Sequence, residues 1–347
     1  MIRGAGVAAA AAAVLAAGAC KPGSGTGPGT YHPPQGVAFT DPATVLSGVA
    51  EFEAVFGVPA LRSVMGLGGV VGVAGAPPVR GAAGASCGGA APAGPAFSPL
   101  GVLPDSVSGW VFVYDSATAR FQAGADSGGP AGGVEFVLPV VDSLNRVLFP
   151  QQNAGTLDLY DVTPPAGMLT LHSVVTGAGG SADYTFADSG TTTAYSGILA
   201  GTASGGGKTI TFRDSTTGLY LQVTAGAVLN EPDRGVQMLL TATRTATDPY
   251  DNYYGVDFTF RSAGQAVRVV GNITTYCLLP SMGLTVSIND TDFAIVNGST
   301  YPLITGLADS TLTDQQDSAL RALIRGQAEM YSWLTALTQP AKQFLGP

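Results

Sequence analysis

The chain has 347 residues, of which 11% are charged, and 15 lysines and arginines against 24 aspartates and glutamates give a net charge of −9. This length allows a sizeable buried core, and the 46% hydrophobic content differs from that of a disordered chain. The negative charge excludes nucleic acid as an expected partner, because the sequence has no basic stripe that would neutralise phosphates.

The first twenty residues have the pattern of an export signal. A positively charged Met1-Ile2-Arg3 start precedes an alanine-rich apolar stretch, and small residues then lead to Cys20. This N-terminus resembles that of bacterial lipoproteins, in which such a cysteine is acylated and begins the mature protein. The resemblance implies loss of residues 1–19, a membrane anchor on Cys20 and, because Lys21 follows it, an outer-membrane address. The alternative is an ordinary secretory signal, cleaved after Ala17-Gly18-Ala19 at the same bond.

Residues 20–39 are rich in glycine, serine, threonine and proline, which predicts a flexible tether. The rest, 40–347, is interpreted as one β-rich domain that contains a glycine-, alanine- and proline-rich linker at 66–109. Export places Cys87 and Cys277 in a compartment that permits oxidation. They form one disulfide or remain two free thiols.

A helix is predicted at each end of this domain. The first begins with Asp41 as N-cap and Pro42 at its first position, and it ends at Gly57. Four apolar residues recur on one of its faces: Val45, Val49, Phe52 and Phe56. The second, 313–338, begins with a capping box of Thr313 and Gln316, carries a broad apolar face and is expected to stop at Pro340.

Alternating apolar and polar residues predict a long series of strands from Trp110 to Val296. The clearest unit is Lys208–Thr224, interpreted as one hairpin whose turn is Asp214–Gly218. Asp-Ser pairs recur through this region, and their short side chains stabilise turns by bonding nearby backbone amides. The pairs are therefore predicted to lie between strands.

Short connections favour antiparallel pairing of neighbouring strands, and most strands carry one apolar and one polar face. The fold class predicted is mainly β (α+β): a long antiparallel meander forms a curved open sheet or half-barrel, with an N-terminal and a C-terminal helix packed on it. A β-sandwich is the alternative.

Few residues suggest chemistry. His172 is the only histidine in the predicted folded domain, and no metal-binding, nucleophile or phosphate-loop spacing is present. No enzymatic activity, cofactor or metal is therefore expected. The segment Asp248–Tyr254 combines carboxylates and aromatics that suit calcium, a sugar or a protein partner, although an ordinary hairpin connection explains it more simply.

Two functions follow from this pattern. The first is a structural or interaction lipoprotein of the cell envelope with an unknown envelope protein as partner. The second is a carrier of a lipid or another apolar ligand, because the order of elements resembles that of the periplasmic lipoprotein-carrier half-barrels. A filled core is the simpler explanation of the same apolar face, whose candidate ligand-binding residues are Ile210, Phe212, Leu221, Phe258 and Phe260.

Overall fold

The computed structural model describes residues 39–66, 103, 105–118, 120–124, 128–142, 145–165, 167–190, 194–219, 222–233, 235–246, 251–262, 264–276, 279–299, 302–307 and 311–345. All of these lie within one unit of the chain, Gln35–Pro347. The predictions made for the tether, for Cys20, Cys87 and Cys277, for Leu221 and for most of the linker fall outside the described residues.

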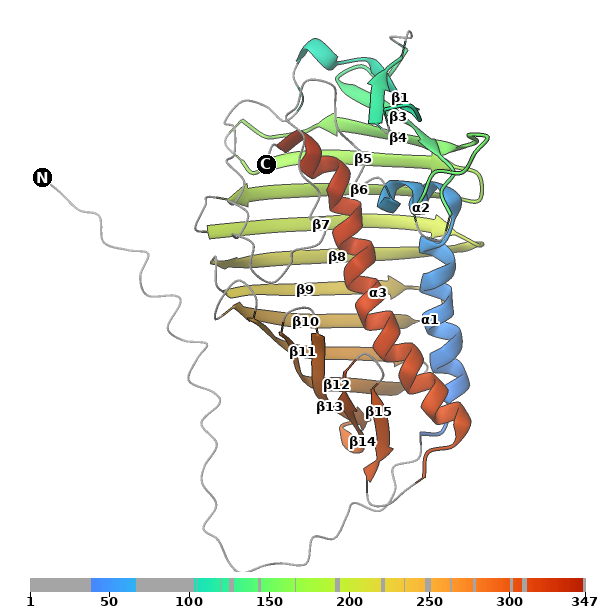
Figure 1. Ribbon diagram of the computed structural model, residues 1–347, viewed down its shortest axis with the longest axis vertical. Helices are drawn as coiled ribbons and strands as arrows, with labels where there is room; N and C mark the ends of the chain where they lie inside the picture. Colours follow the sequence, from blue (N-terminus) through green and yellow to red (C-terminus); the bar gives the residue numbers. More distant parts are fainter. Residues whose placement is uncertain are drawn as a thin grey trace, which may run out of the picture. The chain divides into compact units, whose positions relative to one another are not determined.

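Fifteen strands form a single open sheet, shown in Figure 1. They are β1 (Trp110–Asp115), β2 (Arg120–Ala123), β3 (Gly133–Pro139), β4 (Asn153–Asp161), β5 (Leu169–Gly177), β6 (Gly180–Gly190), β7 (Ala194–Gly205), β8 (Lys208–Leu219), β9 (Gln222–Glu231), β10 (Val236–Ala246), β11 (Asp251–Ser262), β12 (Gln265–Tyr276), β13 (Leu279–Ile288), β14 (Thr291–Gly298) and β15 (Leu303–Gly306). From β3 to β15 each strand pairs antiparallel with its neighbour in the chain. Only β1 departs from this order, lying between β2 and β3 and parallel to β3. The structure thus confirms the predicted meander and its open sheet, and the described strands do not divide into a sandwich.

Three helices, α1 (Pro42–Phe56), α2 (Pro59–Gly66) and α3 (Asp314–Leu345), lie on the same face of the sheet (Figure 1). The helix α1 contacts α3 and strands β7, β8 and β11, while α2 contacts β3 to β6. We call this covered face the inner face and the opposite one the outer face. No single helix in the described part of the chain is long and apolar enough to cross a membrane, and α1 with α2 passes that test only as a pair bent by 73°.

The predicted helix caps are confirmed. The Asp41 carboxylate accepts a hydrogen bond of 3.0 Å from the Thr44 backbone N–H, and Pro42 occupies the first turn. At the start of α3 the capping box is reciprocal: the Gln316 N–H donates to the Thr313 hydroxyl at 3.3 Å, and the Thr313 N–H donates to the Gln316 side chain at 3.0 Å.

The predicted end of the C-terminal helix is wrong, because α3 continues through Pro340 to Leu345. Proline removes one intrahelical hydrogen bond, but the turns before it are held by tertiary contacts. Leu334 and Leu337 are buried, and the buried Tyr184 hydroxyl of β6 donates to the Leu337 carbonyl oxygen at 3.2 Å. Packing against the sheet therefore outweighs the local cost of the proline.

The turn predicted at Asp214–Gly218 is also wrong, since β8 runs without interruption from Lys208 to Leu219. Its whole length pairs with β7, and its last nine residues pair with β9. Asp188 and Ser189 likewise lie within β6. Other pairs do form turns: the Asp115 carboxylate accepts from the Ala117 N–H at 3.0 Å at the end of β1. Ladder pairing on both sides of a strand thus overrides the local preference of Asp-Ser.

Candidate functional site

The outer face carries a continuous row of seven residues, five of them polar and two of them glycine, that crosses seven strands. Its members are paired across β8 to β14: Thr217, Thr224, Thr243, Gly255, Asn272, Gly283 and Asn297. We call this set the outer row. Side chains on neighbouring strands in such a row lie about 4.5–5.5 Å apart. Five of the seven members therefore present a hydroxyl or amide group, and Gly255 and Gly283 leave gaps between them.

Three outer-face glycines leave open space where other strand residues have side chains. A Cβ added at Gly226 would lie 3.5 Å from the Ser215 hydroxyl, and one at Gly255 would meet nothing closer than 4.0 Å. At Gly283 the nearest atom is 3.7 Å away. Steric crowding within the sheet therefore does not require glycine here. Glycine inside a strand is typical of places where another chain or ligand approaches closely.

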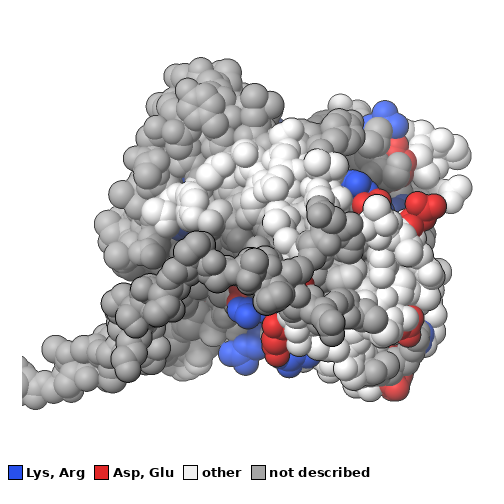
Figure 2. Space-filling view, turned by 90° about the horizontal axis from the view of Figure 1, so that it is seen from below, with Lys and Arg blue, Asp and Glu red and all other residues white. Residues whose placement is uncertain are grey.

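One ion pair on this face joins the neighbouring strands β11 and β12. The Arg268 guanidinium donates to both Asp257 oxygens, at 2.9 and 2.5 Å. This hydrogen bond lowers the pKa of the Asp257 carboxyl below its usual value. Figure 2, a view from below the orientation of Figure 1, shows charged atoms of both signs in small groups at that end of the molecule.

One cluster on the outer face concentrates titratable groups at the β3–β6 end. Glu135 and Asp158 are direct cross-strand partners, and one Asp158 oxygen is buried without a hydrogen-bond partner. Beside them the rings of Tyr160 and His172 stack with centroids 5.7 Å apart, and His172 Nε2 lies 2.8 Å from Asp183 Oδ1. Burial raises the pKa of both carboxyls of the pair, and repulsion from Asp158 raises that of Glu135 further.

Replacing Glu135 by glutamine is expected to stabilise the protein at pH 7. Both carboxyls have raised pKa values in the folded state. The ionised pair therefore disfavours folding at neutral pH. The stability lost in this way returns as the pH falls through the raised pKa values, and it is fully restored below the ordinary pKa values of 4.5 for Glu135 and 3.8 for Asp158. Relief of a like-charge cross-strand pair is worth ~0.2–1 kcal/mol. Urea unfolding at pH 7 and pH 4 should show this gain at the higher pH and a smaller one at the lower pH.

Asp257→Asn is the matched control with the opposite sign. Its pKa is lowered by Arg268, so the charged form supports folding at pH 7 and that support is lost as the pH falls. The neutral asparagine should therefore reduce stability at pH 7. A stabilising D257N together with a destabilising E135Q would show that the charges have been assigned wrongly.

The residues predicted to bind an apolar ligand lie in the core between sheet and helices. Ile210, Phe212, Phe258 and Phe260 are each at most 4% exposed. Phe212 lies with its ring centroid 6.3 Å from that of Phe56 in α1 and 6.0 Å from that of Tyr184. The helix layer continues this packing, because Phe56 stacks on Trp333 of α3 at 4.7 Å.

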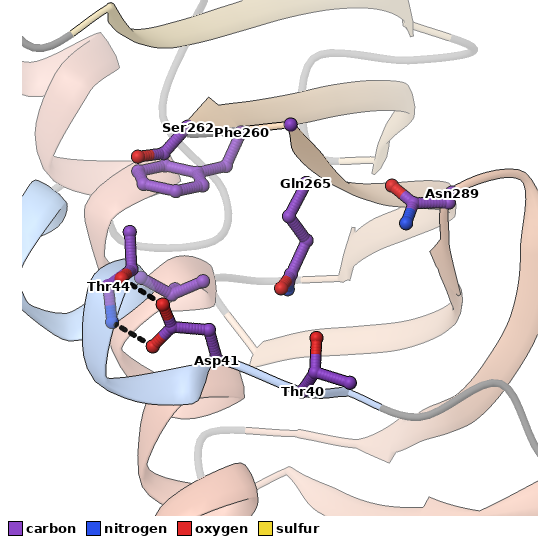
Figure 3. Close-up of a pocket in the computed structure, with 9 residues that line it drawn as sticks. Thr40, Asp41, Thr44, Phe260, Ser262, Gln265 and Asn289 are labelled. Carbon is purple, nitrogen blue, oxygen red and sulfur yellow. Dashed lines mark hydrogen bonds between the residues drawn. The ribbon is translucent and has the colours of Figure 1, made fainter.

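Two depressions are bordered by residues of the helices. One, of about 560 Å³, lies between α1, α2 and α3, and there Arg325 donates to Glu53 at 2.8 Å and lies 3.4 Å from Glu329. The other, of about 250 Å³, lies at the start of α1, where Asp41 faces Gln265 of β12 and Asn289 of the β13–β14 turn (Figure 3). We call the second the α1 pocket. Polar groups contribute to the walls of both.

Other predicted site residues are placed separately. His172 lies on the outer face, far along the sheet from Asp251–Tyr254, which begins β11 and is not a loop. Residues 248–250 fall outside the described part. Within the described residues no group of three or more histidines, cysteines, aspartates or glutamates is placed to hold a metal ion.

The α1 pocket was missed by sequence reasoning. Its members Asp41, Gln265 and Asn289 are more than two hundred residues apart at the extremes, and the sequence identified only Asp41, as a helix cap and not as part of a pocket. Comparison with protein-family models, curated proteins and solved structures finds no significant match to this chain.

Proposed function

We propose that this protein is a non-enzymatic, lipid-anchored component of the bacterial cell envelope, and that it binds an envelope protein through the outer face of its sheet. The export pattern and Cys20 support the anchor and the outer-membrane address. The tether at 20–39 has the composition of a flexible coil, and about 19 such residues have a root-mean-square end-to-end distance of roughly 22–26 Å. That length holds the folded unit clear of the lipid surface.

The contrast between the two faces of the sheet carries the interaction role. The inner face is buried under α1, α2 and α3. The outer face presents the outer row and exposed residues such as Thr241 and Asn272, and no described element covers it. An open sheet of this width stays one-sided in solution only if its free face is polar, and here that polarity is supplied by neutral hydrogen-bonding groups. Such a surface suits a partner that is recognised by shape and hydrogen bonds.

Site-specific photocrosslinking in the native bacterium tests this function. A photoreactive phenylalanine analogue at Thr241 or Asn272 should yield one discrete crosslinked envelope protein, because both positions are exposed on the outer face. The same analogue at Arg62, exposed on α2 of the helix layer, should not yield that product. The products would be compared by immunoblot and identified by mass spectrometry.

Cys20→Ser provides the second control. It removes the acylation site while leaving the folded unit unchanged, so the membrane-bound fraction and the crosslink should both be lost. Equal products from Thr241 and Arg62, or only abundant bystander proteins from both, would contradict an outer-face interaction. A C20S protein that stays in the membrane fraction would contradict the lipid anchor.

The carrier function has weaker support. It requires apolar space under the helices, whereas the four described candidate residues are buried in the core, where Phe212 packs against the rings of Phe56 and Tyr184. The two depressions described above have charged or hydrogen-bonding residues in their walls.

A further inference from the structure

The α1 pocket has walls from three parts of the chain, at the edge of the helix layer and away from the outer row (Figure 3). The lining includes Asp41 and Thr44 at the start of α1, Phe260 and Ser262 of β11, Gln265 of β12 and Asn289 of the β13–β14 turn. The volume of about 250 Å³ is several times the ~30 Å³ that one water occupies in the liquid. It lies just below the ~300–1,000 Å³ of sites for drug-sized ligands, so one small ring is the largest group that fits.

The walls of the pocket are fixed in place by backbone geometry and hydrogen bonds. Gly264 and Asn289 adopt left-handed φ angles of 84° and 46° in two neighbouring turns. The Asn289 side-chain oxygen accepts from the Ala266 N–H at 2.8 Å, and the Asn289 N–H donates to the Ala266 carbonyl at 2.8 Å. On the helix side, Asp41 is held by the Thr44 backbone N–H and hydroxyl. A ligand would therefore meet groups that are already ordered, which lowers the entropic cost of binding.

One donor in the pocket lacks a partner. The Nε2 atom of Gln265 is buried and makes no hydrogen bond to any described residue. Figure 3 shows this amide extending toward Asp41 and Thr40, with Phe260 and Ser262 on one side and Asn289 on the other. Buried polar groups are nearly always hydrogen-bonded, so a donor in the wall of the pocket that has no partner among the described residues can take its acceptor from a bound molecule.

The remaining groups define the class of ligand. Three hydroxyls and two amides line the pocket, Phe260 and Val45 add apolar wall, and none of the lining residues is basic. Hydrogen bonds from the Thr44 side chain and backbone lower the pKa of Asp41, so its carboxylate stays ionised and repels anions. Both Asp41 oxygens already accept hydrogen bonds from Thr44, and Asp41 is the only carboxylate among the described residues of the lining, which leaves a bare metal ion too few ligands.

We propose that the α1 pocket binds one neutral sugar residue, with the Gln265 amide donating to a ring or hydroxyl oxygen and Asp41 accepting from a hydroxyl. Neutral polyols combine donors, acceptors and an apolar ring face, as this lining requires. The site is independent of the outer face, so it would remain if the outer face proved to have no partner.

Saturation-transfer NMR with the folded protein tests the proposal, using methyl β-glucoside, N-acetylglucosamine and glucuronic acid as probes. Transfer to one or both neutral sugars is expected, with dissociation constants of about 1 mM, as for weak single-residue sites. Glucuronic acid, which carries a carboxylate, should bind at least about tenfold more weakly because of Asp41. Equal binding of all three sugars, or of none, would overturn the proposal.

Two variants locate the binding. Gln265→Met keeps the length of the side chain and removes the amide, so neutral-sugar binding should fall about tenfold or more. Gln237→Met, on the outer face of β10, is the matched control and should bind as the unmodified protein does. Asp41→Asn preserves an N-cap and should narrow the preference for neutral sugars over glucuronic acid. Undiminished binding by Q265M, with a folded protein by circular dichroism, would place the sugar elsewhere.

Discussion

Replacing Phe258 by alanine is expected to lower the free energy of unfolding by about 3–5 kcal/mol. Phe258 is fully buried on the inner face of β11, and its cross-strand partners Leu240 and Val269 are buried beside it. Truncation removes the transfer energy of the ring and leaves a cavity that a paired strand cannot close. Urea or thermal unfolding monitored by circular dichroism would measure the loss.

Tyr253→Ala is the matched control, because it removes an aromatic ring from the same strand. Tyr253 is 43% exposed on the outer face, so the expected change is within about 1 kcal/mol. The comparison also decides between a core and a ligand-binding face. A small cost for F258A together with increased uptake of a fluorescent fatty acid would contradict the filled core and favour the carrier function.

Replacing Gly48 by alanine is expected to destabilise the protein by about 1–3 kcal/mol. Alanine in place of glycine in an exposed helix normally adds roughly 0.5–1 kcal/mol of stability. At Gly48, however, the new Cβ would lie 2.6 Å from Cζ of Phe260 and 3.1 Å from Cγ1 of Val236. The helix α1 approaches β10 and β11 closely only because this position has no side chain. Urea unfolding would give the sign and the size of the change in the free energy of unfolding.

The reverse substitution at an exposed position of α1 calibrates the helix propensity. Ala50→Gly should cost about 0.5–1 kcal/mol, since Ala50 faces solvent. The cost of the steric contact at Gly48 is then obtained by comparing the changes in the free energy of unfolding of the two variants. A stabilising G48A would mean that α1 has room to move off the sheet, which is incompatible with the close contact to Phe260.

Local patterns predicted those parts of the fold that depend on local physics. Alternation identified the strands, and the side chains of Asp41 and Thr313 marked both helix starts, because a cap satisfies backbone groups within four residues. The turn at Asp214–Gly218 and the stop at Pro340 failed for the opposite reason. Pairing with β7 outweighed the local preference of Asp214–Gly218 for a turn. Packing of α3 on the sheet, including the hydrogen bond from Tyr184, outweighed the local effect of Pro340.

The sites were less predictable than the fold. The outer row depends on the register of seven strands, and a shift of one residue would turn its members to the other face. The α1 pocket joins Asp41 to Gln265 through tertiary structure alone. Single residues of such sites, threonine, asparagine and glutamine, are common on any sheet, so only their arrangement distinguishes them.

The position of the helices at the two ends of the chain has a consequence for synthesis. Each strand from β4 onward can add to the one made just before it, so the sheet can grow while the chain emerges. The apolar surface of α1 cannot be closed in this way, because α3, its neighbour on the inner face, is made after all the described strands. In a nascent or truncated chain that ends before Asp314, Val49 and Met238 would lack their packing contact with α3 at Gly326. Synthesis of α3 is thus the step after which the apolar surface of α1 can be buried on the inner face.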